Sequence, residues 1–148
     1  MTRILMVILI FFFSNLVIAQ NVDTLFEKRI SAFTWMPDGN AIILNILKVD
    51  KTEKSPPIPK KFKFYIPSKT VELLPIEGGG LVVSPDGHSV AYIKQVNGKD
   101  QIYLYNFTPK ENKLLVNDTL NKFAVNWSPD GKNLVYNIQI GKGAEAKV

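Results

Sequence analysis

The sequence is built on one turn, Trp127-Ser128-Pro129-Asp130-Gly131-Lys132, which leads into the apolar run Leu134-Val135-Tyr136. The same plan occurs twice earlier in the chain: Trp35-Met36-Pro37-Asp38-Gly39-Asn40 precedes Ile42-Ile43-Leu44, and Val83-Ser84-Pro85-Asp86-Gly87-His88 precedes Val90-Ala91-Tyr92. The prolines of successive copies lie 48 and 44 residues apart. A repeat of this length that carries strand-like apolar runs is typical of β-propeller blades.

Each residue type in this turn has a physical reason to recur. Proline fixes φ at about −65°, which suits the second position of a type I turn. Aspartate closes the turn through its own side chain, and glycine takes the positive φ that lets the chain re-enter a strand. A ligand-binding or catalytic role for the three aspartates is the lesser alternative. We therefore predict nine structural turn residues: Pro37, Asp38, Gly39, Pro85, Asp86, Gly87, Pro129, Asp130 and Gly131.

Residues 1–19 have the pattern of a secretory signal peptide. A short positive start is followed by an unbroken apolar run from Ile4 to Phe13, and small residues precede a cleavage site between Ala19 and Gln20. A membrane anchor is the competing interpretation, but the apolar run is too short to span a bilayer. We therefore expect a periplasmic or secreted protein that has no transmembrane span after cleavage.

Composition places the remainder among globular proteins. Of the 148 residues, 46% are apolar and 21% are charged, which is enough for one domain with a core. The absence of cysteine excludes disulfides, thiolate metal sites and a cysteine nucleophile.

The net charge of +5 falls to +4 once the signal peptide is removed. The excess lies in a lysine-rich stretch, which we interpret as a solvated loop and an edge strand kept soluble by lysine. Arginine occurs only at Arg3 and Arg29, and an exported protein with so few arginines is not expected to bind nucleic acid. The lysines of this stretch are Lys48, Lys51, Lys54, Lys60, Lys61 and Lys63.

The pattern of apolar runs and turns predicts ten strands in an all-β fold of about two and a half four-stranded blades. After a lead-in segment at residues 20–30, blade 1 covers about 31–76, blade 2 about 77–120 and a partial blade 3 about 121–148. The predicted strands are 32–35, 41–49, 61–66, 70–74, 81–84, 89–96, 101–107, 113–116, 123–128 and 133–140.

Closed propellers contain about four to eight blades, so this propeller is incomplete. We expect the sequence to be a fragment of a longer chain, because the pattern stops within a blade. The alternative is self-association, in which copies of a complete chain close the ring.

The aromatic residues follow the same repeat. Trp35 and Trp127 occupy equivalent places and are expected in the blade core, with a stacking platform as the alternative. Tyr103 and Tyr105 alternate with Ile102 and Leu104, so the two pairs point to opposite faces of the strand. We expect one of these two rows of side chains to lie on the surface and to contribute to recognition.

The three copies resemble the TolB-like propeller repeat of bacterial envelope proteins. That repeat runs aromatic, Ser, Pro, Asp, Gly, Lys and then an apolar strand ending in tyrosine. Residues 127–136 match it fully, whereas the first copy departs at Met36 and Leu44 and the second at Val83. The resemblance covers residues 30–148 and implies a β-propeller. Proteins with such repeats include periplasmic scaffold subunits, the propellers of prolyl-oligopeptidase-type serine peptidases and sugar-acting enzymes.

Residues that carry chemistry are scarce. The sequence has no Gly-x-Ser-x-Gly elbow, no phosphate-binding glycine loop and no spacing that singles out a pair of carboxylates. The single histidine, His88, follows a turn and is expected to be exposed there; one histidine does not make a zinc site. We therefore predict no catalytic residues, no cofactor and no metal.

The sequence thus favours an exported propeller that acts as a protein–protein interaction scaffold in the bacterial periplasm or envelope, with a protein partner of unknown identity. The alternative is the N-terminal, substrate-gating propeller of a secreted prolyl-oligopeptidase-type serine peptidase, whose catalytic domain would lie outside this sequence. A carbohydrate-binding propeller is a weaker third interpretation.

Overall fold

A computed structural model describes residues 29–47 and 59–139. Ten antiparallel strands and their turns make up these residues, so the all-β prediction is confirmed. The described part contains no helix that could cross a membrane. The predicted signal peptide, most of the lead-in segment, the proline-rich loop around residue 55 and the end of the partial blade lie outside the described residues.

Two of the sheets have four strands each in sequential order. Blade 1 consists of β1 (Arg29–Trp35), β2 (Ala41–Leu47), β3 (Lys60–Tyr65) and β4 (Thr70–Leu74). Blade 2 consists of β5 (Gly79–Val83), β6 (Ser89–Val96), β7 (Lys99–Asn106) and β8 (Glu111–Val116). The third sheet, blade 3, pairs β9 (Asn121–Trp127) with β10 (Leu134–Gln139). All ten predicted strands are present, with ends that shift by a few residues.

Local sequence explains the tight connections. Asn97 and Gly98 both have positive φ, 52° and 74°, which is the type I′ geometry that matches the twist of a hairpin. This turn joins β6 to β7 with unbroken register from Ser89 opposite Asn106 to Val96 opposite Lys99.

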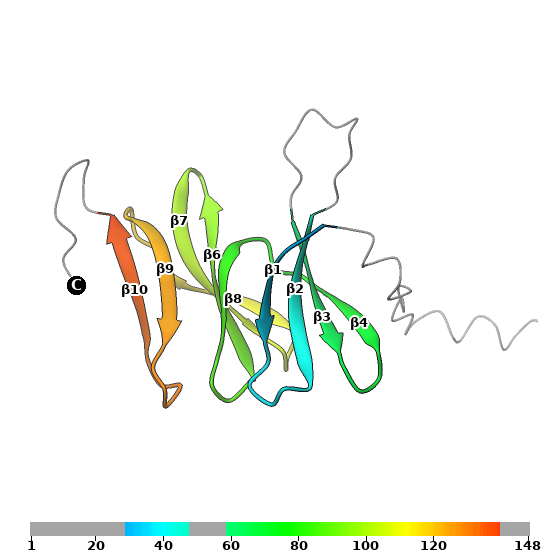
Figure 1. The fold of residues 1–148 in the computed structure, drawn as a ribbon. Coiled ribbons are helices and arrows are strands. Elements are labelled where there is room, and N and C mark those ends of the chain that lie inside the picture. The colour runs from blue at the N-terminus through cyan, green and yellow to red at the C-terminus, as the bar shows by residue number, and fades with distance from the viewer. Residues whose placement is uncertain (1–28, 48–58, 140–148) are drawn as a thin grey trace, which may run out of the picture.

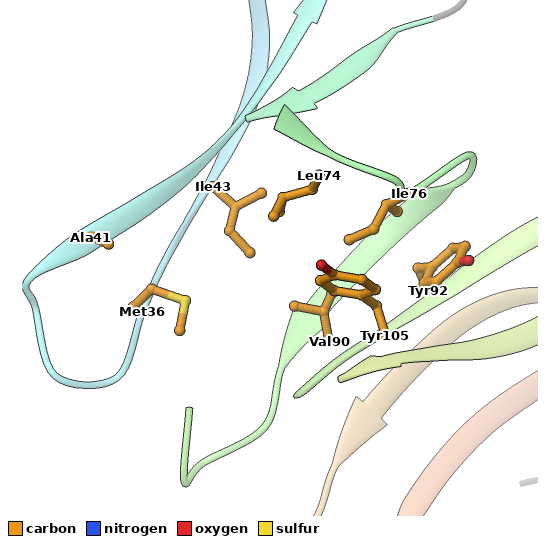
Figure 2. Close-up of a cluster of buried hydrophobic side chains, with 8 residues drawn as sticks. All are labelled: Met36, Ala41, Ile43, Leu74, Ile76, Val90, Tyr92 and Tyr105. Atoms are coloured by element: carbon orange, nitrogen blue, oxygen red, sulfur yellow. The ribbon is translucent and has the colours of Figure 1, made fainter. Parts of the chain in front are cut away.

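The three sheets lie side by side, with blade 2 between the other two (Figure 1). Their first strands adjoin, because β5 contacts both β1 and β9. Buried side chains fill the space between blades 1 and 2, and Figure 2 shows them converging from both sheets. The members of this core are Met36, Ala41, Ile43, Leu74, Ile76, Val90, Tyr92 and Tyr105. A second core between blades 2 and 3 is centred on Ala91, Ile102 and Val125.

Two expectations about surfaces are wrong. The strand β3 is not an edge, since it pairs with β2 on one side and β4 on the other, and its Lys61 is buried. Neither row of β7 lies on an open surface: Ile102 and Tyr105 are both fully buried, because a blade covers each face of the middle sheet. Alternation predicts two faces for a strand, but it does not say what covers each face.

Candidate functional site

The three repeated turns have one backbone geometry. In each, the amide of the glycine donates to the carbonyl three residues earlier: Gly39 to Met36 at 3.0 Å, Gly87 to Ser84 at 2.8 Å and Gly131 to Ser128 at 2.9 Å. The three glycines have φ of 71°, 73° and 71°. Proline therefore occupies the second position and aspartate the third position of each β-turn.

The three aspartate carboxylates bind backbone amides of their own turns. Oδ1 of Asp38 accepts from the amide of Asn40 at 3.0 Å, and Asp86 and Asp130 accept in the same way from residues 88 and 132 at 2.9 and 3.1 Å. The amide hydrogen bond lowers the pKa of Asp38.

A serine adds to this pattern in the second and third turns. The hydroxyls of Ser84 and Ser128 donate to Asp86 and Asp130 at 2.5 and 2.6 Å. The hydrogen bond from the serine hydroxyl is the largest cause, followed by the hydrogen bond from the backbone amide, and together they lower the pKa of both carboxyl groups. In the first turn the serine is replaced by Met36, whose side chain is buried in the core between blades 1 and 2. The departure of the first copy from the repeat thus has a packing reason.

The turns of neighbouring blades lie against one another. A Cβ placed on Gly87 would lie 3.6 Å from Cδ of Pro37, and one on Gly131 would lie 3.5 Å from Cδ of Pro85. Pro37 and Pro85 therefore lie against the glycine of the next blade. The three aspartates, in contrast, are exposed and bind their own turns, and no group of three metal-binding side chains occurs among the described residues.

His88 follows the second turn and is exposed, as predicted. Its side chain is 81% exposed, and Nδ1 lies 3.4 Å from Oδ2 of Asp86.

The two tryptophans have different surroundings, and the expectation that both lie in a core is wrong for Trp35. Trp127 packs on the core between blades 2 and 3, and its Nε1 donates to the carbonyl of Val82 on β5 at 3.2 Å. Trp35 is 54% exposed. Trp35 pairs with Ile42, whose neighbours Ala41 and Ile43 point into the core shared with blade 2. Trp35 therefore lies on the opposite face of blade 1.

That opposite face, which we call the outer face of blade 1, is apolar across all four strands. Two cross-strand rows form it. Phe33 and Leu73 at the ends of the first row are 66% and 55% exposed, whereas Leu44, Phe62 and Val71 in the middle of the face are buried in a small core cluster. The first row is Phe33, Leu44, Phe62 and Leu73, and the second row is Trp35, Ile42, Phe64 and Val71. The corresponding face of blade 2, which carries Val90 and Tyr105, packs against blade 1.

The inner side of blade 1 contributes a cleft at the junction with blade 2. It has a volume of about 240 Å³. One wall is the cross-strand row Ala32, Asn45 and Lys61, which continues from β1 through β2 to β3. The remaining lining residues are Phe33, Thr34, Ile43, Gly79, Gly80 and Leu81.

Lys61 and Asn45 are the polar side chains of this cleft that the sequence interpretation missed. Lys61 is 1% exposed, and its Nζ donates to the carbonyl of Pro59 at 3.2 Å. Burial lowers the pKa of Lys61. Oδ1 of Asn45 is buried without a hydrogen-bond partner among the described residues. The sequence signal for Asn45 is that it is the one polar residue of the apolar strand β2, whereas Lys61 is one of three lysines in β3 and carries no such signal.

A polar cluster joins strands β3 and β4 of blade 1 to the β7–β8 connection of blade 2. Glu72 on β4 forms an ion pair with Lys110 at 2.6 Å and accepts from the hydroxyl of Tyr65 at 2.8 Å. Nζ of Lys63 lies 4.1 Å from the ring centroid of Phe107. Burial opposes ionisation of Glu72, but the hydrogen bonds from Lys110 and Tyr65 outweigh it and lower the pKa of Glu72. Burial, followed by the contact with Glu72, raises the pKa of Tyr65.

No protein-family model and no curated protein matches the sequence. Solved structures do match. TolB from Acinetobacter baumannii has a TM-score of 0.61 and 23% identity over 80% of this chain and 28% of its own. The putative TolB from Agrobacterium tumefaciens has a TM-score of 0.55 and 18% identity over 71% of this chain and 36% of its own.

Peptidase structures match as well. The acylaminoacyl peptidase of Pyrococcus horikoshii has a TM-score of 0.61 and 15% identity over 78% of this chain and 18% of its own. The tricorn protease has a TM-score of 0.56 and 12% identity over 74% of this chain and 11% of its own. The chain thus spans between 11% and 36% of the length of these four structures. With its four-stranded sheets and its repeated Pro-Asp-Gly turns, this chain has the TolB-like β-propeller fold.

Proposed function

We propose that this protein is an exported β-propeller module that acts as a protein–protein interaction scaffold in the bacterial periplasm or envelope. The observation that carries the proposal is the outer face of blade 1, on which Phe33, Trp35 and Leu73 are exposed. Phe33 and Trp35 lie on the same side of β1, and exposed apolar side chains that adjoin one another mark interaction surfaces. The signal-peptide pattern and the likeness to TolB structures support the location.

The repeat indicates what this face binds. Its counterpart on blade 2 packs against an apolar sheet, and Trp127 packs on blade 2 while donating to a backbone carbonyl of β5. We therefore expect the partner to present an apolar β-sheet face with a free strand carbonyl that accepts from Nε1 of Trp35. Buried tryptophans frequently dominate the binding energy of such interfaces.

Photo-crosslinking in the native bacterium tests the proposal. A crosslinking amino acid placed at Phe33 should give one discrete adduct, identified by mass spectrometry as an envelope protein or as another copy of this chain. The control position is Lys99, which is exposed at the start of β7 on blade 2 and should give no such adduct. Equal labelling from both positions, or no adduct at Phe33, would contradict the scaffold function.

Export is tested separately by fractionating the cells and determining the mature N-terminus. Gln20 as the first residue of a periplasmic or secreted protein is the expected result. Recovery of uncleaved chain in the cytoplasm would contradict this part of the proposal.

The alternative is that these blades belong to the substrate-gating propeller of a secreted serine peptidase of the prolyl-oligopeptidase type. The matches to two peptidase structures favour it. In that case the blades would restrict access of peptides to a catalytic domain and would break no bonds themselves. A Gly-x-Ser-x-Gly elbow followed by aspartate and histidine in the downstream coding sequence would support this alternative, and its absence there would count against it.

A further inference from the structure

Lys122, near the start of β9, has a fully buried side chain, and every hydrogen of its ammonium group has an acceptor. Its Nζ forms an ion pair with the carboxylate of Asp118. It also donates to the carbonyl of Leu120 at 2.6 Å and to the carbonyl of Asp100 at 3.2 Å. Since an ammonium group has three donor hydrogens, none is left over. A charge that is taken out of water needs this kind of compensation.

The three acceptors come from two different parts of the molecule. Asp118 and Leu120 belong to the crossover between blades 2 and 3, which comprises residues 117–120. Asp100 belongs to β7, an interior strand of blade 2, and Lys122 itself belongs to blade 3. One buried side chain therefore ties blade 3 and the crossover to blade 2.

The repeat does not require a lysine at this place. Lys122 is the register partner of Ile138 on β10, and the corresponding pair in blade 1 is Ile30 and Ile46. An apolar residue thus occupies the corresponding position of blade 1. The buried lysine is a feature of blade 3 and not of the repeated fold.

Blade 3 depends on its attachment to blade 2. It has two strands within the described residues, and a two-stranded sheet is only marginally stable by itself. Val125 packs on blade 2, and at the end of β9 the Nε1 of Trp127 donates to the carbonyl of Val82. Lys122 supplies the polar attachment at the opposite end of the same strand. Blade 3 is therefore fastened to blade 2 at both ends of β9.

The ion pair is sensitive to the loss of one partner. Without the charge of Asp118, the ammonium group of Lys122 would stay buried against two neutral carbonyls, and breaking a buried ion pair in this way is strongly destabilising. The side chain of Asp118 is 39% exposed, whereas that of Lys122 is 0% exposed. Protons from solvent therefore reach Asp118 while blade 3 is still in place.

We propose that blade 3 is a strap that leaves blade 2 as one unit, and that the ion pair between Lys122 and Asp118 is the latch that keeps it closed. Opening of the strap uncovers the apolar face of blade 2 around Ala91 and Ile102. Acid opens the latch, because a protonated Asp118 does not balance the ammonium charge.

The direction of the pH dependence follows from the folded state. The hydrogen bond from Lys122, followed by the one from the Leu120 amide, lowers the pKa of Asp118 below its ordinary value of 3.8. The latch is therefore closed above pH 3.8 and opens as the pH falls through the lower folded value.

No other described carboxylate lies within ion-pairing distance of Lys122. The ionisable residues nearby on β7 and β10 are Lys99, Asp100 and Tyr136, and none of them forms an ion pair with Lys122 or Asp118.

Hydrogen exchange of the full chain, followed by mass spectrometry, tests the latch. Asp118→Asn keeps the side-chain oxygen that accepts from the Leu120 amide but removes the charge, so it should raise the exchange rates of the β9 amides about tenfold or more. The amides of β2 in blade 1 should exchange as in the parent chain, because the strap opens alone.

Glu77→Gln is the matched control. Glu77 lies in the crossover between blades 1 and 2, and its ion pair with Lys94 is exposed to solvent. Its removal should leave the exchange of β9 unchanged.

Lys122→Met separates the latch from a purely structural role of Asp118. The buried charge is absent in this variant, so adding Asp118→Asn should change the exchange rates of β9 by less than about twofold. The parent chain below pH 3.8 should show the protection of Asp118→Asn, once rates are corrected for the pH dependence of unprotected amides. This acid measurement tests the latch without any substitution.

Three results would overturn the proposal. The first is equal acceleration in β2, which would mean global unfolding, and the second is unchanged exchange of β9 in Asp118→Asn or in acid. The third is an undiminished effect of Asp118→Asn in the Lys122→Met background. None of these involves the outer face of blade 1, so they are independent of the crosslinking result at Phe33.

Discussion

At the scale of single residues, glycine and proline of the repeated turn have separate roles. Glycine supplies the positive φ, which is nearly the same in all three copies. Proline sets the preceding dihedral and also contacts the glycine of the next blade, as Pro85 does with Gly131. One short motif thus shapes a hairpin and also forms part of the contact between blades.

The positive φ leads to a prediction for alanine substitutions. Gly39→Ala and Gly131→Ala should each lower the free energy of unfolding by about 1–2 kcal/mol, because an L-residue is strained in the left-handed region. Gly79→Ala is the matched control: its φ is not positive and its Cβ has open space, so it should be neutral or stabilise by up to about 1 kcal/mol. Urea unfolding midpoints give these differences. Similar losses in all three variants would show that φ is not the cause.

At the scale of strands, β3 and β4 show how neighbours determine the role of a charged residue. Lys63 and Glu72 are register partners on these strands, and Glu72 reaches Lys110 on blade 2. The two blades are therefore joined by an ionic contact between β4 and the β7–β8 connection as well as by the apolar core.

This contact predicts acid sensitivity. The pKa of Glu72 is lower in the fold than its ordinary value of 4.5, so its contribution to stability is present above pH 4.5 and is lost as the pH falls through the lower folded value. Glu72→Gln should lower the free energy of unfolding by about 1–2 kcal/mol at pH 7, since a charge-assisted hydrogen bond is lost. The variant and the parent chain should then converge on acidification.

Denaturant titrations at several pH values measure this difference. Glu77→Gln is the control, because Glu77 pairs with Lys94 in a solvent-exposed position and should contribute little. A difference in the free energy of unfolding between Glu72→Gln and the parent chain that persists at low pH would contradict the ionic explanation.

At the scale of the whole molecule, blades 2 and 3 each pack one face on the preceding blade. Blade 2 presents Tyr92 and Tyr105 to blade 1, and blade 3 presents Val125 and Trp127 to blade 2. The outer face of blade 1 has the same character, and no described element covers Trp35 fully.

The two equivalent tryptophans should therefore respond differently to truncation. Trp127→Ala should lower the free energy of unfolding by about 2 kcal/mol, because it removes packing on blade 2 and the hydrogen bond to Val82. Trp35→Ala should lower the free energy of unfolding of the isolated chain by less than about 1 kcal/mol, because the ring is half exposed. Thermal or urea unfolding at low protein concentration compares them. Equal losses would mean that Trp35 is covered in solution as Trp127 is.

The sequence by itself determined the turns, the strands and their grouping, because these depend on local dihedral preferences and on a period that recurs along the chain. The three Pro-Asp-Gly turns were predicted from neighbours in sequence alone. Only the tertiary structure decided which alternating face is covered. Lys61 is buried, Tyr105 lies in a core and Trp35 is exposed because burial depends on whether another sheet stands opposite, and that neighbour lies tens of residues away along the chain.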